Sequence, residues 1–116
     1  MRFFVLLAIS LAIFGLSAAQ GYTPIQWNSN NVHLVSFLNY GIAQATTAAQ
    51  LNGQLPGQWY WTDVTSLESQ FNSGSGTTDY AFIVDIANFD RDTATIMVIV
   101  TVASDGTESL KNYAIM

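Results

Sequence analysis

The chain has 116 residues, enough for one small globular domain, and half of them are hydrophobic whereas only 9% are charged. Its formal net charge is −5, and no cluster of Lys and Arg occurs, so we expect no binding to nucleic acid or to an anionic membrane surface. The sequence contains no cysteine, which excludes disulfides and thiolate nucleophiles and leaves packing and hydrogen bonds to stabilise the domain.

Residues 1–19 have the layout of a secretory signal peptide. Arg2 precedes an apolar run from Phe3 to Leu16, and the small residues 17–19 follow it. A membrane anchor is the alternative, but this run is shorter than the roughly 20 residues that a spanning helix needs. We therefore expect cleavage near Ala19, secretion into the extracellular space, and a mature domain of residues 20–116 with no membrane association.

One long helix is predicted within residues 28–53. Apolar side chains recur there at spacings of three and four, Asn or Ser at 28–31 can cap its start, and Asn52-Gly53 can end it in a left-handed turn. Gly41 lies inside the helix at a cost of roughly 1 kcal/mol relative to Ala. We interpret it as a point where the helix approaches a sheet closely.

Four strands are predicted after the helix, where the apolar pattern changes to period two. Short polar turns at 89–92 and 104–108 favour hairpins and antiparallel pairing. The expected fold class is α+β, with a single long helix packed on an antiparallel β-sheet of four to five strands. The almost wholly apolar run 96–102 is expected at the centre of the sheet. The predicted strands are residues 58–71, 79–88, 93–103 and 109–116.

Signals for an enzyme, a cofactor or a metal are weak. His33, the one histidine, is expected near the start of the helix with no acid at a motif spacing, and Asp90 and Asp92 are better explained as turn residues than as cation ligands. Trp59 and Trp61 are expected on one face of a strand, where they either pack in the core or form a stacking platform for sugars. We expect neither enzymatic activity nor a cofactor.

Two stretches resemble cystatins, the inhibitors of papain-like cysteine proteases. "GYTPIQWNSNNVHLVSFLNYGIA" (21–43) resembles the flexible trunk and the start of the single long helix of that family. "DVTSLESQFNSGSGTTDYAFIVDI" (63–86) is similar to its second strand, first binding loop and third strand, with Gln-Phe-Asn-Ser-Gly where the family has Gln-x-Val-x-Gly. The resemblance spans residues 21–116 and includes the order of the elements.

This resemblance implies a reversible inhibitor that occludes the active-site cleft of a papain-like cysteine protease with three segments. The residues it assigns to protease binding are Gly21 and Tyr22 in the trunk, Gln70, Phe71, Asn72, Ser73 and Gly74 in the first hairpin, and Ala103, Ser104, Asp105 and Gly106 in the second hairpin.

The chain also departs from the cystatin pattern. Asn72 stands where the family has an apolar Val, several extra residues precede Tyr80, and the second hairpin lacks the Pro-Trp pair of the family. These departures leave a second function open, that of a secreted structural or interaction module with a cystatin-like fold. The family can also exchange its helix and first strand between chains, so both a monomer and a domain-swapped dimer are compatible with the sequence.

Overall fold

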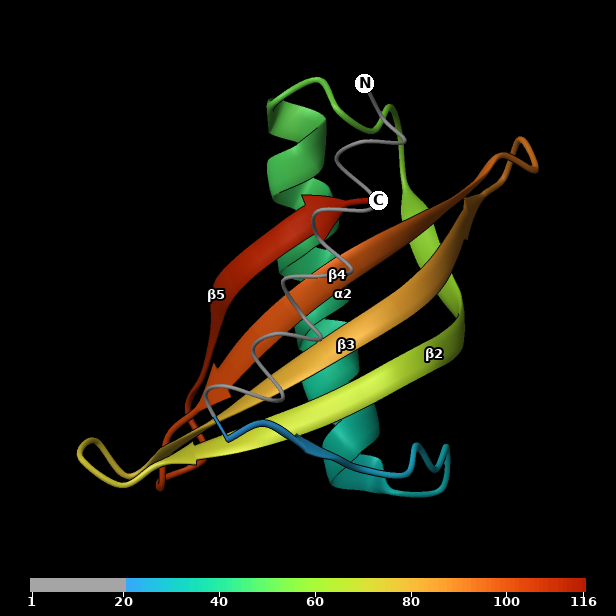
Figure 1. Ribbon diagram of the computed structural model, residues 1–116. Coiled ribbons are helices and arrows are strands. Elements are labelled where there is room, and N and C mark those ends of the chain that lie inside the picture. Colours follow the sequence, from blue (N-terminus) through green and yellow to red (C-terminus); the bar gives the residue numbers. More distant parts are fainter. Residues whose placement is uncertain (1–20) are drawn as a thin grey trace.

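The computed structural model describes residues 21–116, and the expected signal peptide, 1–19, lies outside the described residues. One helix packs across one face of a five-stranded antiparallel sheet in the order β1-β2-β3-β4-β5 (Figure 1). This confirms the predicted α+β fold class. No helix of this part of the chain is long and apolar enough to cross a membrane. The elements are β1 (Thr23–Pro24), α2 (Val32–Leu51), β2 (Trp59–Asn72), β3 (Thr77–Asn88), β4 (Thr93–Val102) and β5 (Glu108–Ile115).

The helix α2 begins and ends where the capping residues predicted it. The side chain of Asn31 accepts hydrogen bonds from the backbone N–H groups of His33 and Leu34, both at 3.2 Å. At the other end, Asn52 is the C-cap and Gly53 takes a left-handed φ of 72°. His33 is exposed in the first turn of the helix, as expected.

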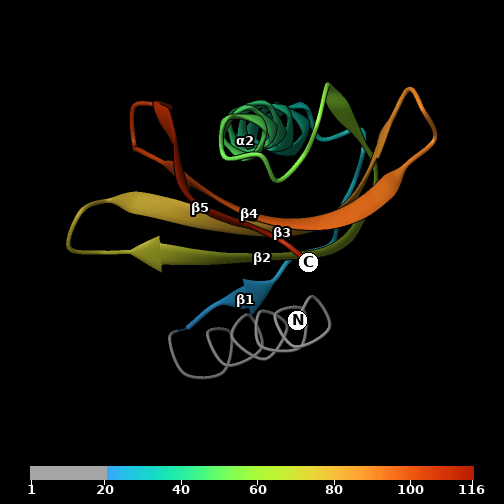
Figure 2. The same cartoon turned by 90° about the horizontal axis from the view of Figure 1, so that it is seen from above.

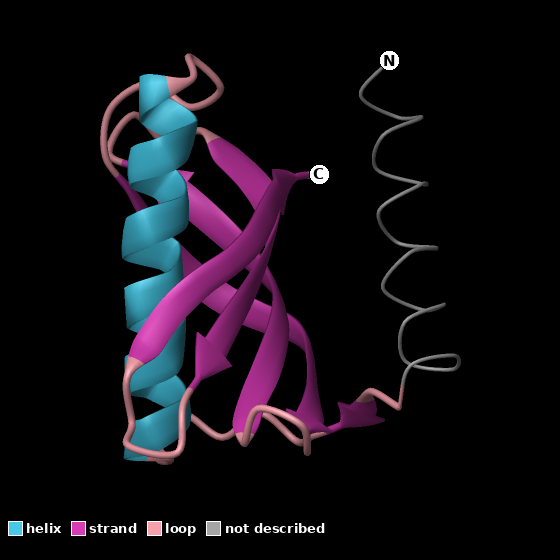
Figure 3. Cartoon of the chain, turned by 90° about the vertical axis from the view of Figure 1, so that its left-hand side faces the viewer, coloured by secondary structure: helices cyan, strands magenta, loops and turns pink. Residues whose placement is uncertain are grey.

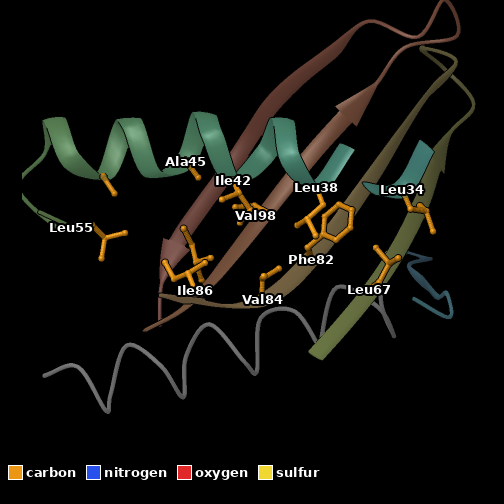
Figure 4. Close-up of a cluster of buried hydrophobic side chains, with 12 residues drawn as sticks. Leu34, Leu38, Ile42, Ala45, Leu55, Leu67, Phe82, Val84, Ile86 and Val98 are labelled. Carbon is orange, nitrogen blue, oxygen red and sulfur yellow. The ribbon is translucent and has the colours of Figure 1, made fainter. Parts of the chain in front are cut away.

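The main core lies between α2 and the concave face of the sheet, as seen from above in Figure 2 and from the side in Figure 3. The helix approaches the sheet closely at Gly41, because a Cβ atom placed there would lie 2.6 Å from Cγ2 of Val100. The interpretation of this glycine as a contact with the sheet is therefore confirmed. Leu38, Ile42 and Phe82 interdigitate beside it (Figure 4).

All four predicted strands are present, with ends that differ by one or two residues. The β2–β3 ladder continues to the pair Asn72 and Thr77, so the first hairpin has a shorter tip than the sequence indicated. The strand β4 is interior, because it pairs with β3 on one side and β5 on the other. Its residues 96–100 are all buried.

The run in β4 is apolar on both faces of the sheet, which explains why its sequence shows no alternation. Ile96 and Val98 face α2, whereas Met97 and Ile99 belong to a second cluster on the convex face together with Ala81 and Tyr22. No helix or strand among residues 21–116 lies over this convex face.

Candidate functional site

Strand register brings the three expected binding segments to one end of the sheet. Thr23 pairs with Ser69 near the end of β2, and Thr78 at the start of β3 pairs with Val102 at the end of β4. Val102 pairs in turn with Glu108, the first residue of β5. The residues beyond these pairs therefore lie side by side, at the lower left of Figure 1 and the left of Figure 2. We call residues 21–22, 70–74 and 103–106 the three-segment edge.

In the trunk segment, only Gly21 is exposed. Its φ of 80° lies in the left-handed region, and a Cβ atom there would contact the side-chain nitrogen of Gln70 at 3.9 Å. Tyr22 is buried with the convex cluster. Its burial is the main reason why the pKa of its hydroxyl is raised, and the nearby charge of Asp79 is the second reason. Tyr22 thus fixes the trunk to the sheet.

The first hairpin closes through a four-residue turn, 73–76. The carbonyl oxygen of Asn72 accepts hydrogen bonds from the N–H groups of Ser75 at 3.2 Å and Gly76 at 2.8 Å. The side-chain amide of Asn72 donates to the Thr77 hydroxyl at 3.3 Å, so the hairpin itself provides a partner for the amide that replaces the family's Val. Gly76 has a φ of 70°, which favours glycine.

Exposure at this hairpin is highest just before and within the turn. The Phe71 side chain is 65% exposed, Ser73 and Gly74 are exposed, and Gln70 and Asn72 are half-buried. A large apolar side chain with this exposure is a ready anchor for an apolar cleft.

The second hairpin is a tight turn held by its own hydrogen bonds. The Ala103 N–H donates to the Thr107 carbonyl at 2.8 Å, and the Gly106 N–H donates to the Ala103 carbonyl at 2.9 Å. Gly106 has a φ of 90°. The Asp105 carboxylate accepts from the Thr107 N–H at 2.9 Å, which lowers the pKa of Asp105. Ser104, Asp105 and Gly106 are exposed and Ala103 is half-buried, so a fixed negative charge marks this tip.

Asp79 connects the two hairpins, and sequence reasoning did not identify it. This carboxylate is 1% exposed and accepts hydrogen bonds of 2.7 Å from both the Thr101 hydroxyl on β4 and the Lys111 ammonium on β5. Burial raises the pKa of Asp79, but the hydrogen bonds from Lys111, Thr101 and the amide of Asn72 outweigh it and hold the pKa below its ordinary value. The network therefore links β3, β4 and β5 directly behind the three-segment edge.

The remaining candidates for chemistry are occupied by structural roles. In the described part of the chain, no group of three His, Cys, Asp or Glu side chains is arranged to hold a metal ion. The turn interpretation of Asp90 and Asp92 is confirmed, because Asn88 Oδ1 accepts from both backbone N–H groups at 3.0 and 2.9 Å. Trp59 and Trp61 both pack against the main core.

Comparison with known proteins does not assign the chain to a family. No family model matches it, and no curated protein matches it by sequence. The cystatin resemblance thus rests on the motifs and the order of elements in this chain.

Proposed function

We propose that this protein is a secreted, reversible inhibitor of papain-like cysteine proteases that occludes the active-site cleft with the three-segment edge. The observation that carries the proposal is the register that places all three segments at one end of the sheet. An inhibitor of this kind needs no catalytic group of its own.

Three further features support this role. Both hairpin tips are closed by internal hydrogen bonds, so little conformational entropy is lost when a partner binds them. Phe71 supplies the apolar contact that the family draws from its Val and Pro-Trp residues. The fixed charge of Asp105 favours association with a protease whose cleft has a basic rim.

The test is a titration of papain and of a cathepsin-L-like enzyme with residues 20–116. The rate at which each protease cleaves a fluorogenic peptide measures the inhibition. We expect reversible inhibition, and we expect Phe71→Ser to raise the inhibition constant about tenfold or more, because a buried Phe contributes about 1.5–3 kcal/mol.

Phe89→Ser is the matched control, since Phe89 is 81% exposed in the turn at the opposite end of β3. The twelve residues of β3 separate the two positions by roughly 35–40 Å. Equal loss in both variants, or no inhibition by a folded protein at micromolar concentration, refutes the proposal.

The second candidate function is an interaction module without inhibitory activity, and the low charge of the chain and its departures from the cystatin pattern favour it. Ala81, Met97 and Ile99 lie on the face of the sheet opposite to α2, and all three side chains are buried. Sedimentation equilibrium of residues 20–116 tests this candidate. Self-association supports it, and a strict monomer that inhibits papain tightly contradicts it.

A further inference from the structure

A groove runs between α2 and the first residues of β2, away from the three-segment edge. It consists of two adjoining cavities of about 340 Å³ and 260 Å³, which share Ala43, Trp59 and Tyr60 in their walls. Since Trp59 and Tyr60 pair with the last residues of β3, the groove lies at the end of the β2–β3 ladder opposite to the hairpin tip.

The helical wall of the groove is polar but uncharged. Asn39, Ala43, Thr47 and Gln50 recur at spacings of three and four, so they form one stripe along α2. Small and hydroxyl side chains in the middle leave space. The Gln50 amide offers donors and an acceptor, and the Asn39 amide offers donors while its oxygen accepts from Trp61. The stripe is roughly 16 Å long, which suits a short chain molecule better than a single ring.

The facing wall is aromatic. Trp59, Tyr60 and Trp61 follow one another in β2, with the two Trp side chains on the face toward the main core and that of Tyr60 on the other face. Phe89 lines the far end of the larger cavity. The rings of Tyr60 and Phe89 lie 5.6 Å apart with an angle of 45° between them, and their side chains are 45% and 81% exposed. Two exposed aromatic rings beside a groove are unexplained by core packing.

The two indoles are fixed in place before any ligand arrives. Trp59 donates its Nε1–H to the Pro56 carbonyl at 2.9 Å, and Trp61 donates to Asn39 Oδ1 at 2.7 Å. Trp27 packs edge-on against Trp61 with ring centroids 5.8 Å apart. Fixed rings lose little entropy on binding, so the groove is preorganised for a ligand that stacks.

No Asp, Glu, Lys, Arg or His lines either cavity. A charged ligand would therefore lose its hydration without gaining an ionic partner, whereas a neutral one would not. Flat apolar faces suit aromatic rings, and hydroxyl groups suit amides and threonines. We propose that this groove binds a neutral oligosaccharide, a role independent of protease inhibition.

The test uses tryptophan fluorescence and calorimetry on residues 20–116 with three probes: cellotetraose, maltotetraose and the anionic tetragalacturonate. We expect saturable binding of a neutral tetraose and none of tetragalacturonate. We expect Tyr60→Ala and Phe89→Ser each to weaken the binding about tenfold, and both variants to fold because the two side chains are exposed. Phe71→Ser should bind the sugar like the unmodified protein.

The groove and the three-segment edge are far apart, so the tetraose should not displace papain. This separates the two proposals, since either activity can be absent while the other persists. The oligosaccharide proposal is overturned if a folded protein binds neither neutral tetraose at about 10 mM. It is also overturned if Tyr60→Ala and Phe89→Ser leave the binding unchanged, or if tetragalacturonate binds equally well.

Discussion

At the scale of single residues, the Asp79 carboxylate orders the three-segment edge. It is nearly fully buried, whereas Lys111 is 55% exposed, so the pair is only partly screened by solvent. Removing the charge of Asp79 leaves Lys111 free to be hydrated, and the loss of stability is therefore moderate rather than severe.

We predict that Asp79→Asn lowers the free energy of unfolding by about 1–2 kcal/mol at pH 7. Because the pKa of Asp79 is lowered in the folded state, its contribution is present above its ordinary value of 3.8 and is lost as the pH falls through the folded pKa. The difference between the two proteins should therefore vanish below that pH in urea unfolding. Asp63→Asn, at an exposed position of β2, is the control for charge. A constant difference across the acid range contradicts the role of the ion pair.

The contribution of Lys111 sets the upper limit of the same window. Its hydrogen bond to Asp79 raises the pKa of Lys111 above its ordinary value of 10.5. The stability that this lysine provides is therefore present below pH 10.5 and is lost as the pH rises through the folded pKa. The ion pair contributes over the whole neutral range.

Gly41 is the second residue whose environment leads to a prediction. A Cβ atom at this position would lie 2.6 Å from Cγ2 of Val100. The Val100 side chain cannot easily move away, because a β-branched residue has few allowed χ1 rotamers. Gly41→Ala should therefore destabilise the protein by about 1–3 kcal/mol, although alanine gains about 1 kcal/mol of helix propensity. In a double-mutant cycle with Val100→Ala, the two losses should be less than additive. A stabilised Gly41→Ala variant contradicts the close contact.

At the scale of elements, the β2–β3 hairpin combines a long ladder with a four-residue tip. The ladder reaches Asn72 and Thr77, and Ser75 forms its hydrogen bonds with these two residues. A Cβ atom at Gly74 or Gly76 would meet no other atom within 4 Å. The tip is thus separable from the fold.

Replacement of residues 73–76 by Asn-Gly tests this separation. A two-residue turn of this type keeps the register of the flanking strands, and shortening the loop changes the closure entropy by less than about 1 kcal/mol. The temperature of thermal unfolding should be nearly unchanged. The inhibition constant for papain should rise at least about tenfold, because the shortened first hairpin no longer extends as far into the active-site cleft. Inhibition that survives the replacement would remove the first hairpin from the binding edge.

The helix and the strands were predictable because each has a local signal. The spacing of apolar residues indicated α2, and Asn31 and Gly53 marked its ends. The Asp79–Lys111 pair was not predictable, since 32 residues separate its members and a register shift between Ile99 and Val100 is needed to bring Lys111 toward β3. Sequence shows neither where a bulge falls nor which polar side chain it redirects.

The groove beside α2 illustrates the same limit. The aromatic residues 59–61 were recognised as candidates for stacking, but the facing amides come from the helix and Phe89 comes from a distant turn. Their juxtaposition depends on how the helix lies across the sheet, which periodicity does not specify.

At the scale of the whole molecule, the first hairpin is also the point where two chains would exchange. If residues 73–76 became extended, α2 and β2 of one chain would pack on β3–β5 of another, and nearly every contact of the monomer would form again between chains. The turn is held closed by Asn72 and by the left-handed conformation of Gly76. The balance between monomer and swapped dimer therefore depends on this turn.

We predict that Gly76→Val increases the fraction of dimer after heating and cooling at high concentration. Valine at a φ of 70° is strained by about 1–2 kcal/mol, and opening of the turn relieves this strain. Gly74→Val is the matched control, because Gly74 is not in the left-handed region and has open space around it. The dimer should not inhibit papain, since extension of residues 73–76 abolishes the first tip while the second hairpin remains. Size-exclusion chromatography with light scattering measures the fractions. Equal dimer fractions for the two variants would show that this turn does not control assembly, and an inhibitory dimer would show that its closed form is not needed for binding.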